Sequence, residues 1–206
     1  MYNVIKRIID VCASFVGLVI CTPLFIVTAV LIKLDSPGPA IYTQKRLKKG
    51  GEEFEIIKFR TMLINAEEVL RSNPALWQEY QREYKIKNDP RVTRIGNFLR
   101  KSSIDELPQL VNILLGDMSL VGPRAYRKEE IEHQMKTYPK IAEQIKVSLT
   151  IKPGLTGVWQ VSGRSNVSFE ERIKMDCNYA KRKSIRYDLY LILLTIPAVL
   201  KTRGAW

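Results

Sequence analysis

The sequence has little of what metal centres and disulfide frameworks need. Its 206 residues include three cysteines and one histidine, and no CxxC pair. Cys12 and Cys21 lie in an apolar run, while Cys177 stands alone. These counts argue against a zinc site and against a disulfide framework, which fits a reducing compartment.

Acidic residues are also in deficit. Lysine and arginine number 33 against 21 aspartates and glutamates, which gives a net charge of +12 and a pI of about 9.7. A basic excess of this size favours anionic partners, such as nucleic acid, anionic lipid head groups or phosphorylated substrates. Hydrophobic residues make up 46% of the chain. The chain can therefore build a core, and its length fits one domain, or one domain with an appendage.

Charge is almost absent from residues 8–32, where Asp10 is the only charged residue. The run is long enough to enter a membrane and too long for the apolar part of a cleaved signal peptide. Thr22-Pro23 lies in its middle and predicts a kink or break, because proline has no N–H to donate. Basic residues flank both ends, which favours the cytoplasmic side for both. A re-entrant helix–break–helix segment over residues 1–35 satisfies both observations, although charge alone leaves a spanning helix as an equal alternative.

Residues 36–206 are expected to form a single unit of the α+β class, mostly helical with one β-hairpin. The apolar run near the C-terminus is too short to span a membrane and is expected to be an interfacial amphipathic or core helix. The expected elements, in order, are strands at 40–46 and 53–60 joined by a turn at 48–51, a helical region at 61–85 interrupted at Asn73-Pro74, a glycine-rich loop region at 152–164, a charged helix at 168–183 and an apolar helix at 189–200.

The carboxylate pair Asp105-Glu106 has two interpretations. In the first, Ser103 caps a helix and Glu106, three residues later, completes a capping box. That interpretation is favoured by the segment alone, but it puts Pro108 inside the helix, where its missing N–H is needed. In the second, the helix begins near Pro108, and the carboxylates sit at its mouth. A helix mouth would lower the pKa of Asp105 and keep it ionised.

Many cations surround this pair in the sequence. Lys58 and Arg60 end the expected hairpin, while Arg100 and Arg124 flank the pair on either side. Arginine binds phosphate oxygens through two parallel hydrogen bonds. A carboxylate among such cations can hold a magnesium ion that bridges a pyrophosphate, or it can attack phosphorus itself. The alternative is that these arginines are solvated surface charge.

Several blocks of the sequence, in order, resemble the monotopic phosphoglycosyl transferases, the bacterial sugar transferases that initiate glycoconjugate assembly. The resemblance covers nearly the whole chain, and its long central block is highly specific. The blocks are KRIIDV at 6–11, LIKLDSPGPAIYTQKR at 31–46, KFRTM at 58–62, RVTRIGNFLRKSSIDELPQLVNILLGDMSLVGPR at 91–124 and KPGLTGVWQVSGR at 152–164.

The resemblance implies a reaction in two steps. Asp105 of the dyad attacks the β-phosphorus of a UDP-sugar, releases the nucleoside monophosphate and forms a covalent phosphosugar intermediate. Undecaprenyl phosphate, a polyprenyl phosphate, then accepts the sugar-1-phosphate. The resemblance also implies Mg²⁺ as cofactor, held by Asp105 and Glu106, and the cytoplasmic face of the bacterial inner membrane as location. By position, Lys58, Arg100 and Arg124 match basic residues of the family's site, and Asp176 and Asp188 match acidic residues near its C-terminal end. With Arg60 and Arg164, which lie in the family's blocks, they are the expected substrate- and phosphate-binding residues.

The sequence departs from the family pattern at a few positions. Thr22 stands where serine is usual at the helix break, and it can still bond back to the helix backbone. Ala125 replaces a frequent proline, and residues 181–187 are more basic than expected. A membrane-anchored adaptor, or a module that binds anionic lipid or nucleic acid without catalysis, is the alternative function. No nucleic-acid motif is present, so nucleic acid is not an expected partner. Membrane lipids are expected partners, and a homo-oligomer is left open.

Overall fold

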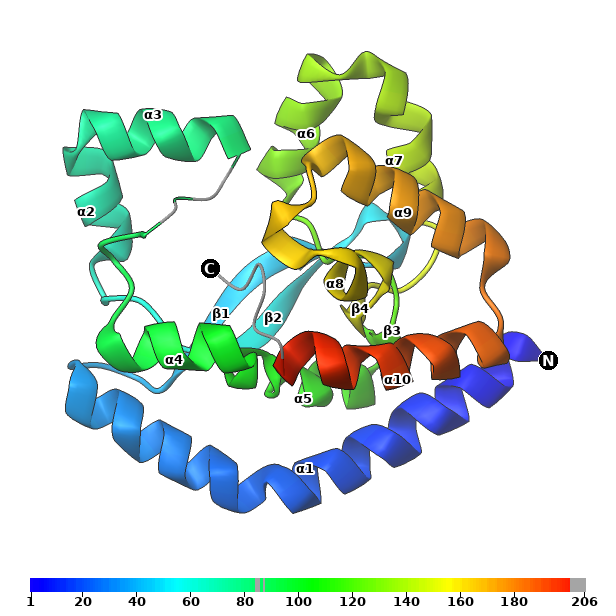
Figure 1. Ribbon diagram of the computed structural model, residues 1–206, viewed down its shortest axis with the longest axis horizontal. Coiled ribbons are helices and arrows are strands. Elements are labelled where there is room, and N and C mark those ends of the chain that lie inside the picture. The colour runs from blue at the N-terminus through cyan, green and yellow to red at the C-terminus, as the bar shows by residue number, and fades with distance from the viewer. Residues whose placement is uncertain (84–85, 87, 201–206) are drawn as a thin grey trace.

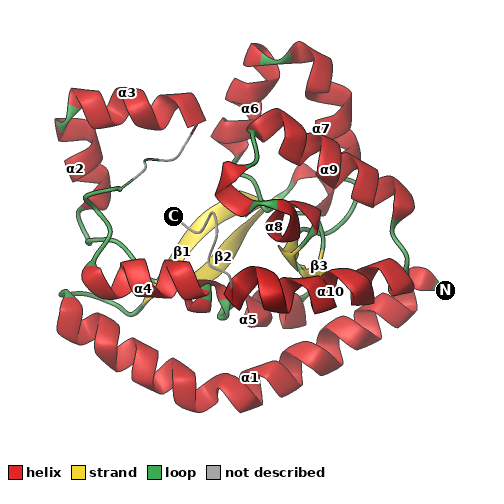
Figure 2. Cartoon of the chain, viewed as in Figure 1, coloured by secondary structure: helices red, strands yellow, loops and turns green. Residues whose placement is uncertain are grey.

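Helices make up most of the part of the chain that the computed structural model describes, which is residues 1–83, 86 and 88–200. Figure 2 shows the helices in red, packed around a two-stranded hairpin in yellow. The expected class, α+β and mostly helical with one hairpin, is confirmed. A second pair of short strands was not foreseen.

The first element is the long helix α1 (Tyr2–Asp35), which contains Pro23. Proline removes the bond to the carbonyl one turn earlier, and the Thr22 hydroxyl donates to the carbonyl of Leu18 at 2.8 Å. Figure 1 shows α1 bent near its middle, with its convex side turned away from the rest of the molecule. The expected break is therefore a bend in a helix that stays continuous.

Helix α1 is bonded to the rest of the protein near both of its ends. Lys6 donates to Asp188 at 2.7 Å, and the carboxylate of Asp10 accepts from the backbone N–H of Leu120 at 3.0 Å. At the other end, Asp35 accepts from the backbone N–H of Ile95 at 3.1 Å. Among the described helices it alone is long and apolar enough to cross a membrane, and only 11% of its most apolar window is buried.

The hairpin consists of β1 (Ile41–Leu47) and β2 (Glu53–Phe59), paired antiparallel from Ile41 opposite Phe59 to Leu47 opposite Glu53. Its turn contains a short 3₁₀ segment, η1 (Lys49–Gly51). Gly50 and Gly51 have φ values of +87° and +82°, which suit glycine because it has no Cβ. The expected strands and turn are confirmed.

Helices α2 (Ala66–Ser72) and α3 (Pro74–Glu83) follow the hairpin. The interruption expected at Asn73-Pro74 is confirmed, since proline starts the second helix. The helical region begins at Ala66 rather than at residue 61, because Met62 forms a β-bridge with Val92. The expected end near residue 85 lies outside the described residues.

Helices α4 (Arg94–Ser102) and α5 (Gln109–Leu115) lie between α1 and the hairpin (Figure 1). Phe54 and Ile56 of β2 pack against Leu110 and Ile113 of α5 in one apolar cluster. A second cluster joins the end of α1, through Ile32, to Phe59 and Leu99. These two clusters fix the segment between α4 and α5 against the end of the hairpin.

The C-terminal half supplies the remaining helices. The charged helix expected at 168–183 is confirmed as α9 (Phe169–Arg182), which starts with a capping box formed by Ser168 and Glu171. The apolar helix is confirmed as α10 (Ile185–Leu200) and begins four residues earlier than expected. The other helical segments are α6 (Lys128–Thr137), η3 (Pro139–Ile141), α7 (Ala142–Ser148), α8 (Val158–Ser162) and η4 (Arg164–Asn166).

The short strands β3 (Ser119–Val121) and β4 (Gly154–Thr156) pair in parallel. A Cβ on Gly154 would lie 2.0 Å from the backbone nitrogen of Gly122, so only glycine permits this approach. The pairing brings the segment that contains Arg124 beside the glycine-rich region. What was expected to be a loop at 152–164 therefore contains a strand and helix α8.

Candidate functional site

Asp105 and Glu106 lie in the connection between α4 and α5. Helix α4 closes at Ser103, which has the left-handed φ of +58°, and a single 3₁₀ turn, η2 (Ile104–Glu106), follows it. The side chain of Ser103 makes no capping bond there, and α5 begins at Gln109, just after Pro108. The capping-box interpretation was therefore wrong, and the start of the helix near Pro108 is confirmed.

Close backbone packing places this connection against the hairpin. The hydroxyl of Thr93 caps α4 by accepting from the N–H of Gly96 at 3.0 Å. A Cβ at Gly96 would lie 2.0 Å from the carbonyl oxygen of Thr61, just past the end of β2. Any other residue would push α4 outward, so Gly96 sets the distance between the carboxylate pair and Lys58.

Lys58 forms an ion pair with Glu106. Its Nζ lies 2.6 Å from Oε1 of Glu106, and both side chains are partly buried. Burial by itself would raise the pKa of Glu106, but the ammonium of Lys58, assisted by Arg124 and Arg164, outweighs burial and lowers the pKa below its ordinary value. Glu106 is therefore held as a carboxylate.

Asp105 behaves differently from its neighbour. It is 9% exposed, and it forms no ion pair with any residue in the described part of the chain. Burial, followed by the negative charge of Glu106, raises the pKa of Asp105 to about 7, against the opposing influence of Lys58 and Arg100. The expectation of a lowered pKa was wrong, because burial at this turn outweighs the nearby cations.

Three arginines expected at the site lie around the carboxylates. Arg100 donates from Nε to the hydroxyl of Thr61 at 3.0 Å, and its charge acts on Asp105. Arg164 donates to the hydroxyl of Ser103 at 2.6 Å, and both it and Arg124 act on the charge of Glu106. With Lys58, cations outnumber carboxylates here, so the site favours an anionic ligand.

Asp176 holds the backbone of Arg124 in place by a hydrogen bond. It is 1% exposed and accepts hydrogen bonds from the backbone N–H of Arg124 at 3.2 Å and from the hydroxyl of Tyr126 at 3.0 Å. Burial raises the pKa of Asp176 to about 7, although these hydrogen bonds oppose the rise. The structure thus places Asp176 as a positioning residue behind the Gly-Pro-Arg segment.

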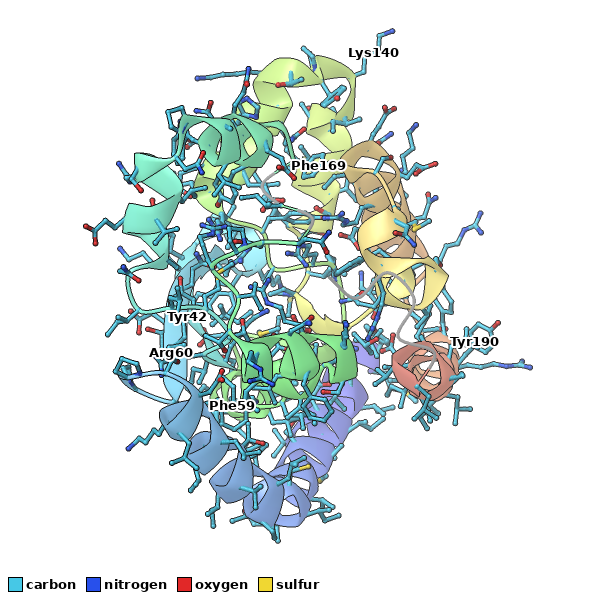
Figure 3. The ribbon with its side chains drawn as sticks, turned by 60° about the vertical axis from the view of Figure 1, so that its left-hand side comes forward. Tyr42, Phe59, Arg60, Lys140, Phe169 and Tyr190 are labelled. Carbon is cyan, nitrogen blue, oxygen red and sulfur yellow. The ribbon has the colours of Figure 1, made fainter. Side chains whose placement is uncertain are left out.

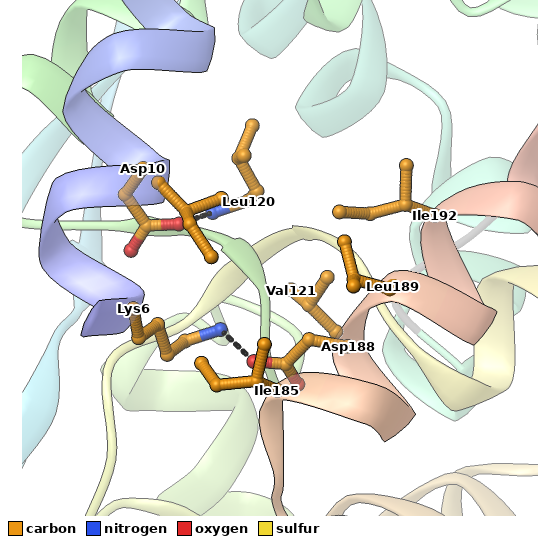
Figure 4. A pocket seen from close by; sticks show the side chains of 9 residues that line it. Lys6, Asp10, Leu120, Val121, Ile185, Asp188, Leu189 and Ile192 are labelled. Carbon is orange, nitrogen blue, oxygen red and sulfur yellow. Dashed lines mark hydrogen bonds and ion pairs between the residues drawn. The ribbon is translucent and has the colours of Figure 1, made fainter. Parts of the chain in front are cut away.

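Two of the expected binding residues lie elsewhere. The guanidinium of Arg60 is buried and donates to the backbone carbonyls of Ser36 and Pro37, so it ties the hairpin to the end of α1 (Figure 3). Asp188 accepts from Tyr2, Lys6 and Tyr179, in a pocket between α1 and α10 (Figure 4). Neither residue is brought to the carboxylate pair: Arg60 joins the hairpin to the end of α1, and Asp188 joins α10 to α1 and α9.

A pocket beside Lys58 and Glu106 contains residues that the sequence did not single out. Arg46 enters it from β1, Gln109 from α5, and Trp159 and Gln160 from α8. Arg46 lies in a block that resembles the family, which could have identified it. The other three also lie in such blocks, Gln109 in 91–124 and Trp159 and Gln160 in 152–164, but their residue types alone do not indicate a binding role.

The donor atoms around the pocket are ready for a ligand. Nε2 of Gln109, Nε of Arg124, Nε1 of Trp159 and Nη1 of Arg164 are buried and bond to no residue that the structure describes. Buried donors in native proteins are nearly always bonded to protein, water or ligand. Their collection beside excess positive charge suits a phosphorylated ligand.

The residues present also fit a magnesium ion. Over the described ranges, no three or more acidic, histidine or cysteine side chains lie together so that they could hold a metal ion. Magnesium rarely needs such a cage, since it is commonly held by one or two carboxylates, waters and substrate phosphates. Asp105 and the second oxygen of Glu106 could supply those carboxylates, as the sequence predicted.

Comparison with known proteins gives matches over almost the whole chain. A family model described as bacterial sugar transferase matches residues 1–202. The exopolysaccharide production protein ExoY of Sinorhizobium fredii is 42% identical over 205 residues, which cover 98% of this chain and 88% of that protein. The undecaprenyl-phosphate galactose phosphotransferase of Salmonella typhimurium is 40% identical over 98% of this chain and 42% of its own length. The UDP-glucose:undecaprenyl-phosphate glucose-1-phosphate transferase of Caulobacter vibrioides is 38% identical over 98% of this chain and 72% of that protein.

Proposed function

The chain belongs to the bacterial sugar transferase family and is a phosphoglycosyl transferase, and we propose that it moves a sugar-1-phosphate from a UDP-sugar to undecaprenyl phosphate through a covalent intermediate on Asp105. Relatives whose names describe transfer to undecaprenyl phosphate support the acceptor. A relative named for UDP-glucose supports the donor. The product would start the assembly of an extracellular glycan, in keeping with relatives named for exopolysaccharide production.

In the first step, Asp105 acts as the nucleophile. A carboxylate oxygen forms a bond to the β-phosphorus, the bond from that phosphorus to the bridging oxygen breaks, and UMP leaves with the electron pair. The buried, unpaired carboxylate of Asp105 supports this role, because a nucleophile held in an ion pair would first have to leave its partner.

In the second step, the acceptor restores the enzyme. A phosphate oxygen of undecaprenyl phosphate attacks the same phosphorus, and the bond from Asp105 to phosphorus breaks. The electron pair returns to the carboxylate, and undecaprenyl diphosphosugar is the product. The ion pair with Lys58 keeps Glu106 ionised. The carboxylate of Glu106 and the ammonium of Lys58 therefore remain charged beside Asp105 in both steps.

The surrounding cations stabilise the charge that develops on phosphate oxygens. Donors that are already in place act most strongly in a water-poor site. Nε of Arg124 and Nη1 of Arg164 are buried and free of partners among the described residues, so no existing bond opposes their use. Asp176 holds the backbone of Arg124 in place for this purpose.

A magnesium ion bound by Asp105 and Glu106 would neutralise part of the diphosphate charge. Treatment with EDTA is expected to stop UMP release, and added Mg²⁺ is expected to restore it. Release that continues at the same rate in EDTA would contradict the metal requirement.

One observation carries the proposal: Asp105, a buried and unpaired aspartate, directly precedes Glu106, which is paired with Lys58 and lines a pocket with excess positive charge. The test incubates the purified protein with UDP-sugars and Mg²⁺, with and without undecaprenyl phosphate. Without acceptor, we expect one UMP per enzyme and a phosphosugar adduct detected on Asp105 by mass spectrometry. Asp105→Asn should give neither. Equal UMP release by Asp105→Asn, or turnover with acceptor but never an adduct, would refute the covalent mechanism.

The membrane placement is also a proposal. Both ends of α1 are bonded to the same body, through Lys6 to Asp188 and through Asp35 to the N–H of Ile95, which supports entry and exit on one side. Basic residues at both ends favour the cytoplasmic face. Exposed apolar side chains on α10 could lie in the same interface, namely Leu189, Leu193, Ile196 and Leu200.

Single cysteines at residues 3 and 45, in a variant without the native cysteines, test this topology in sealed vesicles. Both positions should be labelled from the cytoplasmic side only. Labelling of residue 3 from the periplasmic side and residue 45 from the cytoplasmic side would show a spanning helix instead.

A further inference from the structure

Gln109 is a buried amide without a protein partner. It is the first residue of α5, is 2% exposed, and lines the same pocket as Lys58 and Glu106. Its Nε2 is buried and bonds to no residue in the described part of the chain. An unsatisfied buried amide is unfavourable, so this group indicates that something else bonds to it.

Two neighbouring side chains on α8 also have a buried polar atom that bonds to no described residue. Trp159 is 8% exposed, and its Nε1 is buried without a described partner. The guanidinium groups of Arg124 and Arg172 lie over its ring at 5.0 and 4.9 Å from the centroid. Trp159 therefore has its indole N–H, rather than its ring face, to offer a ligand. Next to it, Oε1 of Gln160 is buried and equally unpartnered among the described residues.

The chemistry of this group differs from that of the phosphate-binding part of the pocket. Phosphate oxygens only accept hydrogen bonds at neutral pH, and the cations around Glu106 already suit them. Two amides and an indole are uncharged and offer donors together with an acceptor. A hydroxyl group both donates and accepts, so hydroxyl groups can bond to the unpartnered donors of Gln109 and Trp159 and to the unpartnered acceptor of Gln160.

We infer that Gln109, Trp159 and Gln160 form the subsite that binds hydroxyl groups of the donor's sugar and so help to decide which sugar is transferred. This inference rests on the proposed function, because it takes the ligand to be a nucleotide sugar. Gln109 follows Glu106 by three residues, so the subsite begins one helical turn from the carboxylate pair. A sugar attached to the β-phosphate would lie within that reach.

The test combines a side-chain change with a substrate change. Gln109→Met keeps the size of the side chain and removes its amide, while Trp159→Phe keeps an aromatic ring but removes the indole N–H donor together with part of the ring system. Each variant is assayed for kcat/KM of UMP release with the preferred UDP-hexose and with its 2-, 3-, 4- and 6-deoxy analogues. We expect each variant to lose about 10- to 100-fold with the parent sugar. With one particular deoxy analogue, variant and wild type should be nearly equal, because the bond is already missing.

Gln134 provides a matched control. It is also a buried glutamine, 4% exposed, with an Oε1 that bonds to no described residue, but it lies in α6 outside this pocket. Gln134→Met should show no dependence on which hydroxyl is removed.

Two results would overturn the inference. The Gln109 and Trp159 variants could keep the activity of the wild type with every donor, or they could lose the same factor with the parent and with all four analogues. The second result would assign them to the phosphates or to folding. Failure of the proposed function would look different, since the wild-type protein itself would then release no UMP from any UDP-sugar.

Discussion

Replacing Asp105 by asparagine should stabilise the protein while it removes turnover. Burial raises the pKa of Asp105 to about 7, whereas the pKa of an aspartate in the unfolded chain is about 3.9. Between these values the unfolded chain loses its proton and the folded protein keeps it. The contribution of this group to folding is therefore most favourable at low pH and is lost as pH rises towards 7.

The size of the effect follows from the same two values. A gap of about three pH units corresponds to about 4 kcal/mol, which is an upper bound on the free energy of unfolding that the carboxylate removes at pH 8. Asp105→Asn should recover part of it at pH 8 and less than about 1 kcal/mol at pH 4.5. For a chain of 206 residues, each kcal/mol moves Tm by about 2–4 °C.

Thermal unfolding in detergent with EDTA, followed by tryptophan fluorescence, measures this difference at the two pH values. Asp117→Asn is a suitable control, because Asp117 is partly exposed and paired with Lys48 at 3.1 Å. Its loss should change the free energy of unfolding by less than about 1 kcal/mol at either pH. An asparagine variant at residue 105 that is less stable than wild type at pH 8, or equally shifted at both pH values, would refute the electrostatic reasoning.

Two further predictions concern the pH dependence of adduct formation and the bonds that hold α1 to the rest of the protein. The rate of adduct formation on Asp105, followed by rapid quenching without acceptor, should rise about tenfold from pH 6 to pH 8, because only the ionised carboxylate attacks and its pKa is about 7; a flat profile would contradict this. Asp188→Ala should lower the free energy of unfolding by about 3 kcal/mol, measured by calorimetry, because it leaves the largely buried ammonium of Lys6 unpaired. The control Asp117→Ala removes a partly exposed ion pair and should lower it far less.

Local patterns predicted much of the fold. The hairpin followed from alternating residues around Gly50-Gly51, and the division between α2 and α3 followed from Pro74. Pro108 was the feature that separated the two interpretations of the carboxylate pair, because its missing N–H fixes where α5 can begin. In each case a backbone restriction within a few residues determined the outcome.

Contacts between distant segments were not predictable in the same way. Strands β3 and β4 have three residues each and pair across more than thirty positions, so neither carries a usable periodicity. The raised pKa of Asp105 depends on how deeply its turn is buried, and the sequence does not show burial. Likewise, Asp188 was grouped with the binding residues by position, although its three partners come from α1 and α9.

The bonds from Tyr2 and Lys6 to Asp188 have a consequence for biosynthesis. They join residues 186 and 182 positions apart. At translation rates of roughly 5–20 residues per second, the first turns of the chain wait roughly 10–40 s for their partner to leave the ribosome. During that delay the first turns of α1 lack these two bonds, although Asp10 and Asp35 can already bond to Leu120 and Ile95. If α1 enters the membrane as proposed, its insertion precedes the closing of the fold at Asp188.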